Sequence, residues 1–111
     1  MIDQVSPSQL SSWVAQQDQA VVVLDVREDW ELQTASVRPE GFEFRHIPMG
    51  QLVQRLSELN PAQPIACLCH HGSRSMQVAS YLAQKGFQQV ANIAGGINAW
   101  STQVDPSVPR Y

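Results

Sequence analysis

Two short stretches of the 111-residue chain consist almost entirely of apolar residues, and each is followed by polar or charged groups. The first is AVVVLDVR, Ala20 to Arg27, and the second is PIACLC, Pro64 to Cys69. An apolar run of this length without polar alternation is typical of a strand that is covered on both faces, as in a parallel sheet. Helices must then cover both sides of that sheet, so these stretches favour an α/β fold.

The remaining segments alternate between helical and strand patterns. Ser6, Pro7 and Gln9 have the form of a capping box with proline at the first helical position, which predicts a helix start. Further helices are expected over 28–36, over 52–59 (apolar face Leu52, Val53, Leu56 and Leu59), from about Ser75 (apolar face Met76, Ala79, Leu82 and Ala83) and over 97–100; further strands are expected over 42–47 and 89–93. The chain, 1–111, is thus predicted to be one α/β domain with a mainly parallel sheet flanked by helices, followed by an irregular tail over about 101–111.

Composition narrows the possible partners. The formal net charge is -3, whereas nucleic acids and anionic membranes are bound by many clustered Lys and Arg side chains. No apolar stretch approaches the ~20 residues that cross a bilayer, and the first ten residues lack a basic segment followed by an apolar one. We therefore expect a cytoplasmic protein with no nucleic-acid or membrane partner.

The segment CLCHHGSRSM, Cys67 to Met76, lies where a predicted buried strand ends and a helical pattern begins. The helix is expected to begin near Arg74 or Ser75, only five or six residues after Cys69, so the connection must curl tightly, and Gly72 permits the necessary backbone angles. A loop of this kind directs successive N–H groups toward a common centre, and the helix adds the positive end of its dipole. The segment is predicted to bind an anion at the carboxyl end of the sheet, where open α/β folds place their ligands.

The same geometry favours the thiolate form of Cys69, which is the nucleophilic form of a cysteine. Ser73 and Ser75 offer hydroxyl donors, and His70 and His71 offer partial positive charge. Arg74 is always protonated and fork-shaped, so we expect it to be the fixed cation that binds an anionic substrate. The alternative for Cys69 is a buried structural thiol, which is the commoner role of a free cysteine.

The order of these motifs resembles the rhodanese family of sulfurtransferases. The matching segments are DVRE, then HIPMGQL, His46 to Leu52, and then PIACLCHHGSRSMQVASYLAQKGFQQVANIAGGINAW, which holds the family's strand, active-site loop, helix, strand and closing GG-x-x-x-W segment. The resemblance extends from about Val21 to Trp100. It implies a rhodanese-like three-layer domain with a central sheet of about five strands.

The resemblance also implies the chemistry. Cys69 is the residue that carries sulfur: its thiolate attacks the outer sulfur of a small anionic donor such as thiosulfate, sulfite leaves, and a persulfide remains. An acceptor, either cyanide or a thiol such as that of a small protein, then removes the sulfur. Such covalent two-step catalysis needs no cofactor, and the residues expected to bind the substrate are those that follow Cys69: His70, His71, Gly72, Ser73, Arg74 and Ser75.

Two other functions stay open. Related phosphatases and arsenate reductases place five residues between the cysteine and the arginine, whereas sulfur-transferring relatives place four, and this chain has four. The spacing therefore favours sulfur transfer. The other alternative is a non-catalytic module whose loop binds an anion or a partner protein. The chain departs from the family pattern over residues 34–46, and His70 and His71 stand where many relatives have Lys or Arg.

Three further side chains have two interpretations each. Asp25 and Arg27 either order the active-site loop or form an ion pair that holds neighbouring elements together. Cys67 lies two residues before Cys69 on the same side of the strand, so we expect it to pack in the core rather than to act as a second thiol. Metal binding by the Cys and His cluster is not expected, because one extended strand cannot wrap four neighbouring side chains around an ion.

Overall fold

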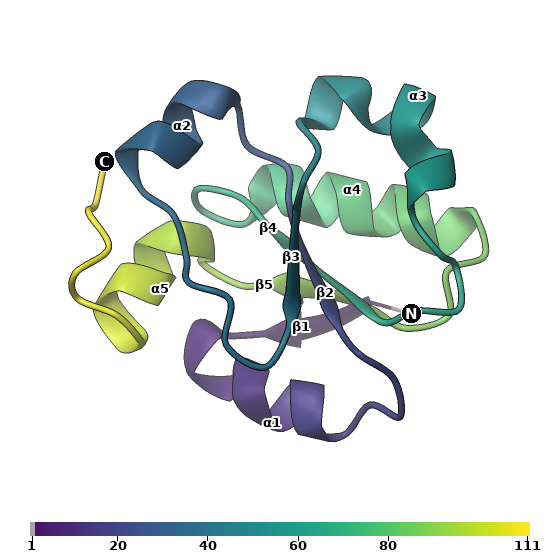
Figure 1. Cartoon of the computed structure of the whole chain (residues 1–111), viewed down its shortest axis with the longest axis horizontal. Coiled ribbons are helices and arrows are strands. Elements are labelled where there is room, and N and C mark those ends of the chain that lie inside the picture. Colours follow the sequence, from purple (N-terminus) through teal and green to yellow (C-terminus); the bar gives the residue numbers. More distant parts are fainter. Residues whose placement is uncertain (1) are drawn as a thin grey trace.

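The computed structural model describes residues 2–111, and its centre is a sheet of five strands that all run parallel (Figure 1). The sheet order is β1-β5-β4-β2-β3. The strands are β1 (Ile2–Val5), β2 (Val22–Asp25), β3 (Glu43–His46), β4 (Ile65–Leu68) and β5 (Val90–Ile93). Every residue of β2, β4 and β5 is buried, which agrees with the unbroken apolar runs that predicted the first two of these strands.

Successive residues of the central strands enter two separate hydrophobic cores. Val23, Ala66 and Ile93 pack with residues of α1 (Leu10–Ala15) and α5 (Gly96–Gln103) on one face. Val22 and Cys67 pack with residues of α3 (Leu52–Arg55) and α4 (Ser73–Gln84) on the other face. The predicted α/β class, with a parallel sheet between helical layers, is confirmed.

Local signals account for several helix boundaries. The capping box of Ser6 and Gln9 is present and starts a short 3-10 turn, η1 (Pro7–Gln9), that leads into α1. α2 (Asp29–Thr34) follows β2, and α4 ends just before Lys85 and Gly86, the latter having a φ of +92°. α5 extends to Gln103, so the tail expected to be irregular from residue 101 is irregular only from residue 104.

The structure corrects other expectations. The segment predicted as one helix over 52–59 is divided into α3 and η3 (Leu56–Glu58), and a further 3-10 turn, η2 (Met49–Gln51), precedes it; Val53 is 69% exposed instead of buried. The buried face of α4 is formed by Ser75, Val78, Ala79 and Leu82, and not by Met76 and Ala83. The edge strand β1 was not predicted, since two of its four residues, Asp3 and Gln4, are exposed polar residues that give no apolar run.

Within residues 2–111, the helices are too short or too polar to span a lipid bilayer.

Candidate active site

The predicted loop lies at the carboxyl end of the sheet, between β4 and α4. Cys69 follows the last residue of β4, and α4 begins at Ser73 with Gly72 as its cap residue, at a φ of +108°. A side chain at Gly72 would be strained at this angle and would lie 3.2 Å from the backbone nitrogen of Gly95. The expected role of Gly72 in a tight curl is therefore consistent with its backbone angle.

The first turn of α5 holds the loop through backbone hydrogen bonds. The N–H groups of Ile97 and Asn98 donate hydrogen bonds to the carbonyl oxygens of Cys69 and His70, at 2.8 and 3.1 Å. Gly96 lies directly against the same two carbonyls, and a Cβ atom there would overlap both of them. The segment Ala94-Gly95-Gly96 thus lies in close backbone contact with the loop, and this contact requires glycine at position 96.

Cys69 Sγ points into the curl of the loop. The N–H of Gly72 donates a hydrogen bond to the sulfur at 3.1 Å, and Ser75 Oγ lies 3.2 Å from it. Cys69 as a whole is 1% exposed. A backbone donor therefore faces the sulfur in a largely dry environment, where it stabilises negative charge on that atom more effectively than in water.

A polar side chain that the sequence analysis missed, Asn92 of β5, lies beneath the loop. Ser75 Oγ donates to Asn92 Oδ1 at 2.5 Å, and Asn92 Nδ2 donates to the Gly72 carbonyl at 3.3 Å. Asn92 Nδ2 also donates to Gln4 Oε1 of β1 at 3.0 Å. Asn92 is only 4% exposed, so it fixes both the hydroxyl beside the sulfur and the turn that carries the Gly72 N–H.

Arg74 forms an ion pair that was not predicted. Its two terminal nitrogens donate to both carboxylate oxygens of Glu31 in α2, at 2.6 and 2.8 Å. The side chain of Glu31 is 3% exposed, and the hydrogen bonds from Arg74 are the main reason why the pKa of Glu31 is lowered to about 2. The charge expected to attract an anion is thus already balanced by a buried carboxylate.

Asp25 and Arg27 form a second buried ion pair. Both side chains are 0% exposed, and Arg27 Nη2 lies 2.8 Å from Asp25 Oδ2. Arg27 also donates to the carbonyl of Ala35 at 2.8 Å and to the hydroxyl of Tyr111 at 3.0 Å. These contacts hold β2, the end of α2 and the tail together. They are connected to the loop through Tyr111, whose hydroxyl donates to Glu31 at 2.6 Å, because Glu31 in turn binds Arg74.

The two histidines, His70 and His71, directly follow Cys69 in the loop. The His70 ring stacks on the Tyr111 ring and lies against the His71 ring at a tilt of 31°, with centroids 3.9 Å apart in both cases. Burial, followed by the neighbouring His71, lowers the pKa of His70, so its ring is biased toward the neutral form. His71 and Ser73 are exposed at the mouth of the loop.

Cys67 lies in the hydrophobic core. It is 0% exposed, and its side chain packs with apolar residues of β2, α4 and β5. Burial is the main reason why the pKa of its thiol is raised far above the usual value. This position agrees with the expected packing role.

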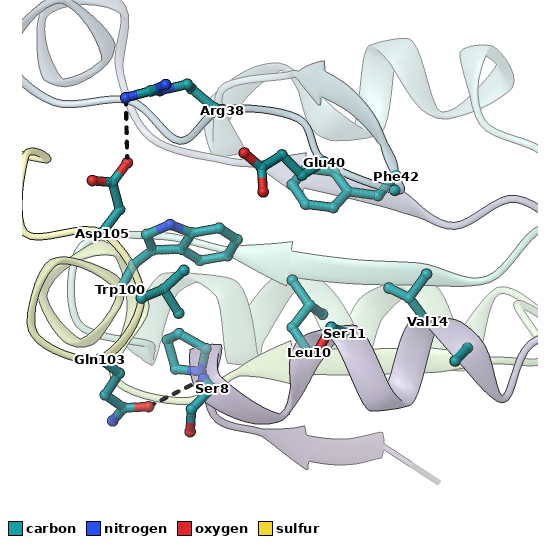
Figure 2. A pocket seen from close by; sticks show the side chains of 14 residues that line it. Ser8, Leu10, Ser11, Val14, Arg38, Glu40, Phe42, Trp100, Gln103 and Asp105 are labelled. Carbon is teal, nitrogen blue, oxygen red and sulfur yellow. Dashed lines mark hydrogen bonds and ion pairs between the residues drawn. The ribbon is translucent and has the colours of Figure 1, made fainter.

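A separate cavity of about 700 Å³ lies away from the loop (Figure 2). Its walls come from η1, α1, the 38–42 segment and α5, with Phe42 and Trp100 packed edge to face. Arg38 and Asp105 lie 4.0 Å apart across one rim. Both polar and apolar residues line this cavity, and none of the residues from Cys69 to Ser75 is among them.

Comparison with known proteins identifies the family of this chain. The sequence matches the model of the Rhodanese-like domain family over residues 6–103, which is most of the chain. The chain therefore belongs to the rhodanese family, as the motifs predicted.

Individual relatives support the same assignment. A protein from Allochromatium vinosum named "Sulfurtransferase" is 30% identical over 108 residues, covering 97% of this chain and 96% of that protein. The Arabidopsis thaliana "Rhodanese-like/PpiC domain-containing protein 12, chloroplastic" is 44% identical over 93 residues, which is 80% of this chain but 30% of that protein. The chain thus spans less than a third of the length of the plant relative.

The fold agrees as well. The crystal structure of a rhodanese-related protein from Thermoplasma volcanium superposes with a TM-score of 0.76 at 28% identity, covering 98% of this chain and 99% of that one.

Proposed function

We propose that this protein is a sulfurtransferase that moves a sulfane sulfur through a persulfide on Cys69. The observation that carries the proposal is the position of Cys69 Sγ, which receives the Gly72 N–H at 3.1 Å inside a tight loop at the carboxyl end of β4. Family membership and the sulfurtransferase names among the relatives support the same chemistry. Thiosulfate is the proposed test donor, and cyanide or a thiol, such as that of a small protein, is the proposed acceptor.

The first half of the reaction forms the persulfide. The Cys69 thiolate attacks the outer sulfur of thiosulfate, a new S–S bond forms to Cys69, and the S–S bond of thiosulfate breaks. Sulfite leaves with the electron pair of the broken bond. The Gly72 N–H donates to the sulfur on which charge is present before attack, and the same donor stabilises the anionic persulfide after it.

The second half returns the enzyme to its starting state. Cyanide attacks the outer sulfur of the persulfide, the S–S bond to Cys69 breaks, and thiocyanate leaves while the electron pair returns to Cys69 as thiolate. A thiolate acceptor reacts in the same way and becomes a persulfide itself. The sulfur on Cys69 is thus held covalently between two substrates that need not be present together, which predicts ping-pong kinetics.

The loop length distinguishes this proposal from phosphate or arsenate chemistry. Four residues separate Cys69 from Arg74, and the Arg74 fork is occupied by both oxygens of Glu31. Attack on the central phosphorus or arsenic atom would require the loop to enclose the whole oxyanion, which needs a wider loop and a free arginine fork. Sulfur transfer at Cys69 needs neither, since attack occurs at the terminal sulfur of the donor.

The test is the intact mass of the protein after brief exposure to thiosulfate. We expect a gain of one sulfur atom, about 32 Da, that disappears on addition of cyanide, as an activated thiolate predicts. Cys69→Ala should show no gain, and Cys67→Ala, the matched control, should gain sulfur like the unmodified protein. No gain with thiosulfate or with inorganic polysulfide would contradict the proposal, as would turnover of a phosphate ester or arsenate without sulfur transfer. Equal binding of a protein partner by Cys69→Ala would favour a non-catalytic module.

A further inference from the structure

Residues 104–111 lie beyond the part of the chain that matches the family, yet this segment reaches the candidate active site. It leaves α5 and returns along that helix toward α2 (Figure 1). Val108 is 4% exposed in the core, and its carbonyl accepts a hydrogen bond from Ser101 Oγ at 2.6 Å. The Val108 N–H donates to the carbonyl of Asp105 at 3.0 Å. The segment is therefore anchored before it reaches the site.

The ring of Tyr111 packs flat against the loop. Its plane lies within 4° of the His70 ring at a centroid distance of 3.9 Å. Trp30 of α2 packs edge-on against the same tyrosine, with centroids 6.0 Å apart. His70 Nε2 is buried and has no hydrogen-bond partner among residues 2–111, so this edge of the ring is covered by its neighbours. The stack therefore fixes the loop residue that directly follows Cys69.

The hydroxyl of Tyr111 connects the two ion pairs of the site. It donates to Glu31 Oε2 at 2.6 Å and accepts from Arg27 Nη1 at 3.0 Å. Glu31 in turn binds Arg74 through both carboxylate oxygens. Burial and the neighbouring Glu31 raise the pKa of Tyr111 to about 12, so the hydroxyl keeps its proton near neutral pH and remains a donor. One side chain thus fixes both the loop and the carboxylate that positions Arg74.

Cys69 is only 1% exposed, so a sulfur donor reaches Sγ only when the loop and its neighbours give way. We propose that Tyr111 is a positioning residue that determines specificity: its ring holds His70 in the closed loop and limits the size of the reagent or sulfur donor that reaches Cys69, while its hydroxyl holds Glu31 and Arg74 in place. The sulfur-donor part of this inference rests on the proposed function, whereas the control of access to the thiol does not.

The test compares two alkylating reagents of different size, iodoacetamide and a fluorescein-bearing maleimide, with the site of labelling identified by peptide mass. Tyr111→Ala is expected to raise the ratio of the maleimide rate to the iodoacetamide rate at Cys69 by about tenfold, a change equivalent to about 1.4 kcal/mol. Tyr111→Phe keeps the ring and should stay within about twofold of the unmodified protein. Arg110→Ala, a change at the exposed neighbour, is the matched control and should leave the ratio unchanged.

Cys67 reports whether each variant is folded, because it is fully buried in the core and becomes labelled only on unfolding. If Tyr111→Ala labels Cys67, Tyr111→Leu replaces it with the same expectation, since leucine fills space but cannot stack. A ratio that stays within about twofold in the folded variant overturns the inference. An equal increase in both rates also overturns it, since that result indicates general loosening and no selection by size.

A second arm uses sulfur donors and separates the ring from the hydroxyl. Tyr111→Phe should raise the KM for thiosulfate several-fold with little change in kcat, because Glu31 and Arg74 then hold the start of α4, which attracts the anion, less firmly while the stack is kept. Tyr111→Ala should in addition favour an aromatic thiosulfonate over thiosulfate in kcat/KM. If the unmodified protein accepts sulfur from neither donor, the proposed function fails, and the labelling ratio still decides the role of Tyr111.

Discussion

Replacing Glu31 by glutamine tests whether the buried carboxylate, and not the arginine alone, organises the site. The carboxylate receives two hydrogen bonds from Arg74 and one from Tyr111, and its side chain is 3% exposed. Its pKa is lowered from 4.5 to about 2, mainly by the hydrogen bonds from Arg74. A lowering of that size corresponds to about 3 kcal/mol, and because the Arg74 side chain is 34% exposed we expect about 2 kcal/mol in solution.

The contribution of Glu31 to the stability of the folded protein depends on pH in a defined way. A carboxyl group whose pKa is lowered on folding stabilises the folded state fully above its unfolded pKa, and this contribution is lost as the pH falls through the folded value. The contribution of Glu31 should therefore be complete near neutral pH, decline below about pH 4.5 and be lost near pH 2. Glu31→Gln lacks the charge at every pH, so the difference between the two proteins should shrink in the same range.

Urea unfolding from about pH 7 down to about pH 3 measures the difference in the free energy of unfolding between Glu31→Gln and the unmodified protein. The matched control is Glu58→Gln, since Glu58 also pairs with an arginine, Arg55, at 2.8 Å but on the surface. We expect that control to change stability little, because exposed ion pairs are screened by water. A Glu31→Gln protein as stable as the unmodified one near neutral pH, or a loss of stability that does not vary with pH, would refute the reasoning.

Three further predictions test the framework of the loop and the core beneath it. Gly96→Ala should lower the free energy of unfolding by at least about 2 kcal/mol and disturb the loop, because the added Cβ overlaps the carbonyl of Cys69. Gly50 lies in open space, so Gly50→Ala should change that free energy by no more than about 0.5 kcal/mol. Equal urea midpoints for the two variants would contradict this prediction. Cys67 should react with iodoacetamide at least about tenfold more slowly than Cys69 in the folded protein, and comparable rates by peptide mass would show that the core assignment is wrong. Asn92→Ala should lower the free energy of unfolding by about 1–3 kcal/mol, because buried polar groups of the loop lose their partner, and an unchanged midpoint would argue against that role.

The elements that could be predicted from the sequence are those whose signals are local. β2 and β4 are continuous apolar runs, and the candidate nucleophile, its glycine and its arginine lie within six consecutive residues, 69–74. Such features depend on backbone geometry over a short stretch, so a pattern of residue types is enough to identify them. Strand β1 escaped prediction because an edge strand with exposed polar residues has no such pattern.

The residues that could not be predicted are brought to the loop by the fold. Glu31 is 43 positions before Arg74, Asn92 is 17 after Ser75, and Tyr111 is 80 after Glu31. An asparagine in an otherwise apolar strand was a usable signal for Asn92, since buried polar side chains need partners. Nothing in the tail sequence pointed to Tyr111, because its contacts arise from the packing of Val108 beneath α5 and not from a local motif.

The pairing of every buried charge near the loop affects how the site can bind anions. Arg74 is balanced by Glu31, and Arg27 by Asp25, so the groups that attract an anion are mainly the backbone N–H groups and the start of α4. A free arginine fork would bind a donor and the leaving sulfite with similar strength, and such uniform binding does not raise the turnover rate. The Gly72 N–H, directed at Cys69 Sγ, acts instead on the atom whose charge and bonding change in both steps of the proposed reaction. For the proposed reaction we therefore expect the carboxylate of Glu31 to favour release of sulfite, and the geometry of the loop to set the affinity for the anionic donor.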